Sequence, residues 1–526
     1  MSQMLKSSGA MGIATLSSRV LGMVREILYA KFMGDSWVAG AFQMAYMIPN
    51  LFRRLLGEGA LTAAFIPIFK EKERREGEKA MWHAANAVLS GLVIAASAII
   101  GLCLLSISVA LHYFDFTTDT RLMLELLRLM FPYMLLVCVA AVFMGMLNAR
   151  GYFFIPALGA TMLNVVMIAT VLWIAPRFGP TLQHQIFGLA IGVLLAGFAQ
   201  ALFQWPSLRR EGFRWRWVKP WGNETVRTTV RKMIPGMLGV AAFQLNVLLT
   251  QGMAFAVDSQ IVASFGYAVR LMELPQGVFG ISLATYLLPT LAGLAADKNF
   301  AQFRSTLREG ISYLVFVNWI ASVLLTVLAV PIVRLLFERG EFDAESTARA
   351  GFALACLAPG LIAFSLVNIL ARAFYALGDT TTPMKISAVC LGLNLVFAFG
   401  LIPSFKQGGL GIANTMSACF NVWLLFYALR RKLSPLDLSE TKREIWTMAG
   451  AGLVAGQCAW FAFRGWERWV GHENLVERIG SVFCPAAIGG LIYGGLLVWL
   501  KVPAAIDFWE LFLQKIRRRK DREEGQ

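Results

Sequence analysis

Long apolar runs separated by short polar stretches dominate the pattern of this chain of 526 residues. A helix rises about 1.5 Å per residue, so roughly 20 apolar residues are needed to cross the hydrocarbon core of a bilayer. Fourteen runs reach that length, which predicts an all-α polytopic membrane protein. The predicted spans are 9–32, 36–69, 83–106, 122–147, 155–175, 186–205, 233–256, 260–291, 311–333, 350–372, 384–403, 408–429, 445–463 and 479–500.

The composition supports a membrane protein, because 57% of the residues are hydrophobic and only 15% are charged. Soluble domains carry about 25% charged residues. The formal net charge of +16 would suggest a nucleic acid partner for a soluble protein. Here the basic residues lie in short loops between apolar runs, so we expect them to set membrane orientation, with no nucleic acid partner.

Lysine and arginine are distributed unevenly between the two sets of loops. The amino-terminal end and every second loop hold 31 of them, the opposite loops hold 9, and 8 lie inside the predicted spans. The positive-inside rule therefore predicts a multi-pass protein with both termini cytoplasmic. The first apolar run carries arginines and continues into a long helix, so we interpret it as the first span and expect no cleavable signal peptide.

An internal repeat divides the chain. An offset of 223 aligns 41–65 with 264–288, and an offset of 227 aligns 148–156 with 375–383. Both offsets cover six predicted spans, which predicts two six-helix lobes related by a pseudo-twofold along the membrane normal, plus two carboxy-terminal helices. The predicted parts are an N-lobe (1–205), a basic cytoplasmic interlobe loop (206–232), a C-lobe (233–431), a linker (432–444), spans 13 and 14 (445–500) and a basic tail (501–526).

The interlobe loop interleaves tryptophan with arginine. This pattern suits an interfacial segment at an anionic leaflet, but the favoured interpretation is a plain linker whose positive charges anchor the orientation.

Six of the eight basic residues inside spans belong to spans 1, 2 and 8. Arginine at membrane depth is costly and normally faces a bundle interior or a wet cavity. The guanidinium group is always charged and offers a planar fork of donors suited to phosphate. We therefore expect a diphosphate-binding cavity, whose candidate substrate-binding residues are Arg19 and Arg25 on span 1, Arg53 on span 2 and Arg270 on span 8.

Two further groups accompany these arginines. The supporting residues are Arg54, Glu26, Glu58 and Glu273. They are close enough in sequence to the candidate arginines to form internal salt bridges with them. Such salt bridges are the alternative role of the candidate arginines. The candidate hinge residues, where proline and glycine permit bending, are Pro49, Gly57, Pro275 and Gly277.

No catalytic or metal-binding constellation is present in the sequence. The seven cysteines lie within apolar runs at scattered spacings, and the four histidines are isolated. No Gly-rich phosphate loop ends in Gly-Lys-Ser or Gly-Lys-Thr. We therefore expect no enzyme activity, no metal and no cofactor.

Four stretches resemble a known family. The runs SSRVLGMVRE, IPNLFRRLLGEGALTAAFIPIF, YAVRLMELPQGVFGISLATYLLP and FYALGDTTTPMK are similar to the signature stretches of the MurJ (MviN) family of lipid II flippases, in the multidrug/oligosaccharidyl-lipid/polysaccharide exporter superfamily. The resemblance implies a bacterial inner-membrane transporter that moves lipid II for peptidoglycan synthesis by alternating access. It further implies that membrane lipids and cell-wall synthesis enzymes are partners, and that spans 13 and 14 form a groove for the lipid tail.

The family's essential cavity arginines fall on the four candidates named above. The chain departs from its relatives at Val269 and Gly40, where they often carry Asp, and at Glu26, where Asp is more familiar. These departures put in question any ion coupling that relies on the acidic residues of the relatives at these positions. A flippase for another polyprenyl-diphosphate glycan and a non-transporting cell-wall scaffold remain alternative functions.

Overall fold

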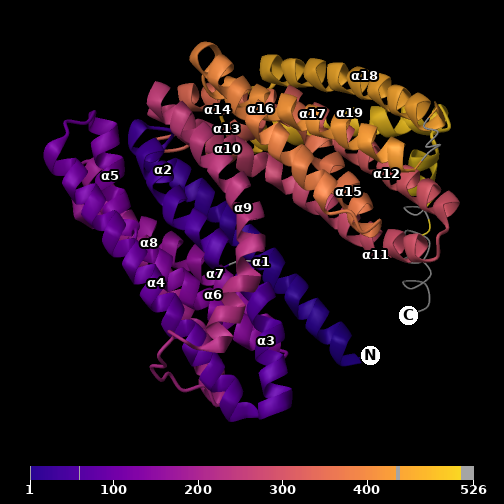
Figure 1. Ribbon diagram of the computed structural model, residues 1–526. Helices are drawn as coiled ribbons and strands as arrows, with labels where there is room; N and C mark the ends of the chain where they lie inside the picture. The colour runs from indigo at the N-terminus through magenta and orange to yellow at the C-terminus, as the bar shows by residue number, and fades with distance from the viewer. Residues whose placement is uncertain (1, 58–59, 434–438, 511–513, 515–526) are drawn as a thin grey trace, which may run out of the picture. The chain divides into compact units, whose positions relative to one another are not determined.

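The computed structural model describes residues 2–57, 60–433, 439–510 and 514, and all regular structure in these ranges is helical (Figure 1). The chain forms two compact units. The first comprises Met1–Ala263 and Arg339–Phe342, and the second comprises Ser264–Glu338 and Asp343–Gln526.

The first unit is a bundle in which α1 packs on α7, α2 on α5, and α8 on both α6 and α7. Its elements are α1 (Ser2–Met33), α2 (Trp37–Phe52), the π-helical segment η1 (Arg53–Gly57), α3 (Ala60–Glu76), α4 (Glu78–Tyr113), α5 (Thr118–Met130), α6 (Tyr133–Ala149), α7 (Phe154–Ala169) continued by η2 (Thr170–Ile174) and η3 (Ala175–Phe178), α8 (Leu182–Arg210) and α9 (Glu224–Val257).

The turn between α1 and α2 shows how local sequence sets these boundaries. Gly34 has φ +58°, a left-handed conformation that favours glycine, and the Ser36 hydroxyl accepts the Ala39 N–H at 3.3 Å to cap α2. A Cβ on Gly34 would lie 2.4 Å from the carbonyl oxygen of Glu341, so the position is also sterically closed. The turn therefore requires glycine for two independent reasons.

The second unit packs its helices around a core that includes Phe303, Phe374 and Tyr493. The buried Tyr493 hydroxyl donates to the Phe316 carbonyl at 3.0 Å. The elements are α10 (Ser259–Pro275, which begins in the first unit), the π-helical η4 (Gln276–Ile281), α11 (Ser282–Ala296), α12 (Phe300–Val327), α13 (Ala329–Phe337), α14 (Ala344–Leu357), η5 (Ala358–Gly360), α15 (Leu361–Ala376), α16 (Thr381–Phe405), α17 (Gln407–Lys432), α18 (Ser439–Trp469) and α19 (Leu475–Trp499).

The helical fold class agrees with the prediction, whereas the number of spans stays a prediction. Among the described residues ten helices are long and apolar enough to cross a membrane, or eleven if α5 and α6, bent by 43°, form one span. α1 and α18 are not among the ten. Arg19, Arg25 and Glu26 reduce the apolar character of α1, and glycines, tryptophans and Gln457 reduce that of α18.

Two predicted boundaries differ from the structure. The interlobe loop, expected over 206–232, shortens to 211–223, because α8 continues to Arg210 and α9 already begins at Glu224. The seventh predicted span was assigned to the C-lobe, yet α9 packs on α2, α3 and α4 within the first unit. Hydropathy locates apolar runs, but it does not show how far a helix extends beyond lipid or which neighbour it packs against.

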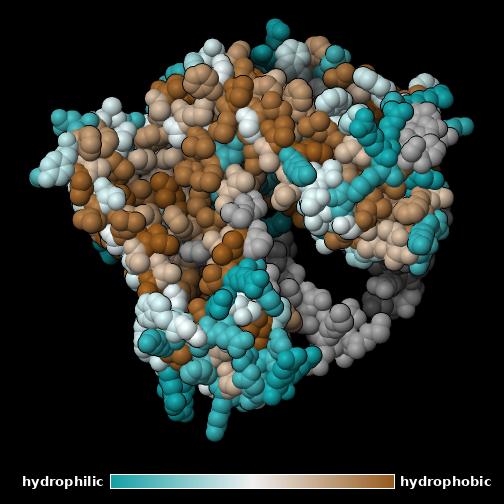
Figure 2. Space-filling model, in the orientation of Figure 1, coloured by the Kyte–Doolittle hydropathy of each residue, from teal (hydrophilic) through white to brown (hydrophobic). Residues whose placement is uncertain are grey.

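The visible surface of the first unit follows the membrane pattern. Along α4 and α8 it is mainly hydrophobic, and hydrophilic residues gather at the end where α3 meets α4 (Figure 2). The charged turn between these helices therefore lies outside the apolar band.

Candidate functional site

Arg25 lies two turns before the end of α1 and is the most enclosed of the four candidate arginines. Its Nη1 donates to Asn164 Oδ1 at 3.0 Å, and its Nη2 pairs with Glu26 Oε1 at 2.5 Å. The guanidinium also lies 5.4 Å from the centre of the Tyr29 ring. Only 14% of the Arg25 side chain and 11% of the Glu26 side chain are exposed, so this charge pair is largely withdrawn from solvent.

Asn164 on α7 is a functional candidate that the sequence analysis missed. Its Nδ2 donates to the Ser18 carbonyl at 3.1 Å while its Oδ1 accepts from Arg25, so one amide joins α7 to two successive turns of α1. Asn164 is buried. The available signal was a polar residue in the otherwise apolar run 155–175, because a buried amide requires hydrogen-bond partners.

Arg19 occupies a different environment on the same helix. Six residues place it about 9 Å before Arg25 along the helix axis and on another face. Its side chain is exposed and, within the described part of the chain, makes no hydrogen bond or ion pair. On α1, Arg25 is therefore a largely buried cation held by its partners, whereas Arg19 is an exposed cation.

Arg53 and Arg54 lie within the π-helical segment η1, a type of helix distortion that is frequent at functional sites. Arg53 Nε donates to Asn50 Oδ1 at 2.7 Å, one turn earlier. Arg54 Nη1 reaches Gln244 Oε1 on α9 at 3.5 Å. Both side chains are half-buried. Glu58, predicted to support them, lies outside the described residues.

Arg270 on α10 belongs to the second unit. It pairs with Glu273 one turn later at 2.9 Å, and the two side chains are 46% and 51% exposed. The salt bridges left open as alternatives in the sequence therefore form at both Arg25 and Arg270. Arg25 belongs to the first unit and Arg270 to the second.

The candidate hinge residues all lie at or near a π-helical segment. Pro49 is inside α2 shortly before η1, and Gly57 is the last residue of η1. Pro275 ends α10, and Gly277 is buried within η4. The offset of 223 derived from the repeat carries 53–57 onto 276–280, which is η4 except for its final residue.

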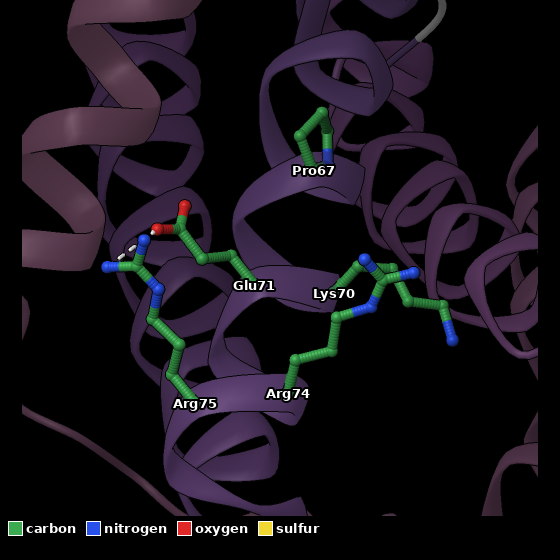
Figure 3. A pocket seen from close by; sticks show the side chains of 5 residues that line it. All are labelled: Pro67, Lys70, Glu71, Arg74 and Arg75. Carbon is green, nitrogen blue, oxygen red and sulfur yellow. Dashed lines mark ion pairs between the residues drawn. The ribbon is translucent and has the colours of Figure 1, made fainter.

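A shallow concavity at the carboxyl-terminal part of α3 offers another group of basic side chains. Its lining residues all come from this one helix and are Pro67, Lys70, Glu71, Arg74 and Arg75 (Figure 3). Arg75 pairs with Glu71 at 3.3 Å, as drawn, and Lys70 pairs with Glu73 at 2.8 Å. These side chains are engaged along a single helix and do not converge from several elements.

Metal chemistry has no support in the described ranges, where no group of three His, Cys, Asp or Glu side chains could hold an ion. The cavity hypothesis rests on guanidinium groups alone.

Comparison with known proteins places this geometry in a family. The model of the family "Lipid II flippase MurJ" matches residues 29–478. The "Probable lipid II flippase MurJ" of Haemophilus influenzae is 31% identical, over 93% of this chain and 98% of the relative. The "Lipid II flippase MurJ" of Burkholderia cenocepacia is 30% identical, over 92% and 95%.

Solved structures agree at the level of the fold. A lipid II flippase MurJ in an inward closed conformation has a TM-score of 0.76 and 21% identity, covering 93% of this chain and 98% of that one. An inward-facing multidrug transporter of the MATE family and the MOP superfamily has a TM-score of 0.65 and 17% identity, covering 81% and 99%. Since the family model and curated relatives each cover most of the chain, the protein belongs to the lipid II flippase MurJ family.

Proposed function

We propose that this protein is a lipid II flippase, which moves the undecaprenyl-diphosphate-linked peptidoglycan precursor from the inner to the outer leaflet of the cytoplasmic membrane. The observation that carries the proposal is the family match over residues 29–478. The arginines within apolar helices add a chemical reason, because the diphosphate of the substrate is the part that lipid cannot solvate.

The two best-described arginines suit different steps of anion capture. Arg25 is held by Glu26, Asn164 and Tyr29 and keeps its orientation without substrate. Arg270 is 46% exposed and pairs with the exposed carboxylate of Glu273. Such a pair exchanges partners at low cost, so an incoming phosphate can replace the carboxylate.

Alternating access requires each unit to change shape or to rotate, and the π-helical segments are the natural places to bend. η1 and η4 each interrupt a long apolar helix beside a proline. We infer that Pro49 and Gly57 in one half, and Pro275 and Gly277 in the other, serve as hinges for that motion. Under the offset of 223 the two π-helical segments correspond, which supports two related lobes, although the prolines do not align.

The direction of transport can come from the membrane potential or from a monovalent ion, without a cofactor. An inside-negative potential favours outward movement of an anion by about 2.3 kcal/mol per charge per 100 mV. Flipping measured in liposomes at zero and at imposed potential tests this idea, and equal rates would remove the potential as the driving force.

The proposed orientation has both termini in the cytoplasm, following the excess of basic residues in every second loop. On the resemblance to the family, α18 and α19 contribute the groove for the polyprenyl tail. The two helices pack on each other, and α18 also packs on α12.

Complementation of a flippase-depleted bacterium tests the function directly. Wild type is expected to restore growth, whereas Arg19→Ala, Arg25→Ala, Arg53→Ala and Arg270→Ala are expected to fail at normal membrane levels. Arg128→Ala, an exposed arginine of α5, is the matched control and should complement. Failure of a well-inserted wild type would indicate another lipid-linked glycan, and rescue by all four variants would indicate a scaffold.

A further inference from the structure

The segment between α8 and α9 is an ordered strap on α4. Residues 213–221, here called the RW strap, follow α4 in an extended path (Figure 1). Asn86 of α4 donates through Nδ2 to the Arg214 carbonyl at 3.0 Å and accepts the Arg216 N–H at 3.1 Å through Oδ1. One turn later, Ser90 Oγ accepts the Val218 N–H at 3.2 Å.

This spacing follows from the two backbone geometries. Four helical residues advance about 6 Å, and two extended residues advance about 6.6 Å. Asn86 and Ser90 are four residues apart, and the two N–H groups that they accept, on Arg216 and Val218, are two residues apart. A polar residue on each turn of α4 therefore fixes every second residue of the strap.

Apolar contacts secure both ends of the strap. The Phe213 ring is buried against Trp82, Trp205 and Phe143, with ring centres 5.5, 5.8 and 6.0 Å away. Pro220 is buried at the other end, where its Cβ would lie 3.3 Å from a Cβ built on Gly91. The strap is thus anchored before and after its exposed middle.

The exposed side of the strap combines cations and indole rings. Arg214, Arg216 and Lys219 are exposed, and the fractional exposures of Trp215, Trp217 and Trp221 are 40%, 58% and 65%. No acidic residue occurs from 212 to 223. The preceding Glu211 is already bonded to Arg150 and Tyr152, so no carboxylate on the strap neutralises its cations.

The strap lies where α4 leaves the membrane. α4 has 36 residues and is therefore about 54 Å long, against a hydrocarbon core of about 30 Å. Between Ser90 and His112 the only polar residues of α4 are serines, whereas its other end carries Glu78, Lys79, His83 and Asn86. The strap covers this more polar end of the helix, which we place at headgroup depth although the hydropathy pattern starts the predicted span at residue 83.

We propose that the RW strap is a binding site for anionic phospholipid headgroups on the side that the proposed orientation makes cytoplasmic. Arginine and lysine near such a surface are attracted by its negative potential, and tryptophan prefers the interface because its ring is apolar while its N–H is polar. An extended backbone held against a helix presents both kinds of side chain without the ordering cost that a flexible loop would pay.

Hydrogen exchange of the full chain tests this site in nanodiscs of phosphatidylcholine with and without phosphatidylglycerol. The anionic lipid should slow exchange of the strap amides in wild type. The triple variant R214Q/R216Q/K219Q should lose this slowing, by about fivefold for each charge removed, and the difference should shrink at high salt. Asn86 and Ser90 stay intact in this variant, so the strap remains docked on α4.

The matched control is R227Q/R231Q/K232Q, which removes the same charge from exposed positions at the start of α9. It should keep the slowing of the strap amides. Equal exchange in both lipids, or equal loss in both triple variants, would overturn the assignment. Inorganic phosphate in place of phosphatidylglycerol should have no effect, and slowing by phosphate alone would show an adventitious ion site. Because the readout is local exchange, failure here is independent of lipid II transport.

Discussion

Arg25 and Arg270 carry the same charge within apolar helices, but their surroundings differ. Arg25 is 14% exposed and has an adjacent carboxylate, a buried amide and an aromatic ring as partners, whereas Arg270 is 46% exposed and its ion pair with Glu273 is itself about half exposed. An arginine with that many buried partners also stabilises the fold. A half-exposed ion pair contributes little to stability, and in the proposed mechanism Arg270 binds phosphate.

The repeat sharpens this contrast. The same offset that superimposes η1 on η4 carries Arg270 onto Met47 and Arg53 onto Gln276. The halves thus share the position of the helix break but not the position of the charge. Under this sequence offset the π-helical segments correspond, whereas the arginines do not.

Arg25→Ala is expected to have the largest effect. It leaves Glu26 buried without its partner, which typically costs about 3–5 kcal/mol, and it removes a phosphate-binding group. Stability and lipid II transport should therefore both fall, as measured by thermal unfolding of purified protein and by complementation. The double variant Arg25→Ala/Glu26→Gln should recover most of the stability but none of the transport. Recovery of both would assign Arg25 a purely structural role.

Arg270→Ala should abolish lipid II transport without a large change in stability. Its ion pair with Glu273 is about half exposed, and such pairs contribute about 0–1 kcal/mol. Unfolding should change little while transport is lost. Glu273→Gln serves as the matched control and should retain transport, because phosphate replaces that carboxylate in the proposed mechanism. A large loss of stability in Arg270→Ala would contradict the contrast with Arg25.

Asn164→Ala tests whether orientation of Arg25 matters beyond its charge. The substitution removes two hydrogen bonds and exposes the Ser18 carbonyl and one Arg25 nitrogen to an apolar gap, at an expected cost of about 1–3 kcal/mol. Transport should decrease but persist. Asn164→Gln keeps the amide but lengthens the side chain. Its transport should lie between that of wild type and that of Asn164→Ala. Unchanged transport would mean that Arg25 is oriented sufficiently without Asn164, by partners that include Glu26 and Tyr29.

Much of this fold could be predicted from the hydrophobic pattern, because lipid selects long apolar helices. The arginines stood out for the same reason, since a charge in such a run is conspicuous. Asn164 escaped notice because a single amide in an apolar run resembles many satisfied core residues, and only the fold brings it to Arg25. The strap on α4 could be predicted only in part. Its composition suggested an interface, but its anchoring by Asn86 and Ser90 depends on packing between segments that are distant in the sequence.

Arg150 lies outside the membrane and is expected to have a purely structural role, so it is a reference for the stabilising part of the role of Arg25. It donates to Glu211 at 2.8 Å and pairs with Glu73, joining the ends of three helical hairpins. Hydrogen bonds from Lys70 and Arg150 lower the pKa of Glu73, and those from Tyr152 and Arg150 lower the pKa of Glu211. We expect Arg150→Gln to reduce stability by about 1–2 kcal/mol at neutral pH and to leave transport intact.

The lowered carboxyl pKa values also fix the pH dependence of that effect. Because the folded protein holds these carboxylates ionised more strongly than the unfolded chain, their contribution is complete above the ordinary pKa of 4.5 and is lost as the pH falls through the lowered values. The difference in thermal stability between wild type and Arg150→Gln should therefore be constant near neutral pH and shrink in acid below about 4.5. A gap for Arg150→Gln that persists in acid would mean that packing of the arginine stem, rather than its ion pairs, joins the hairpins.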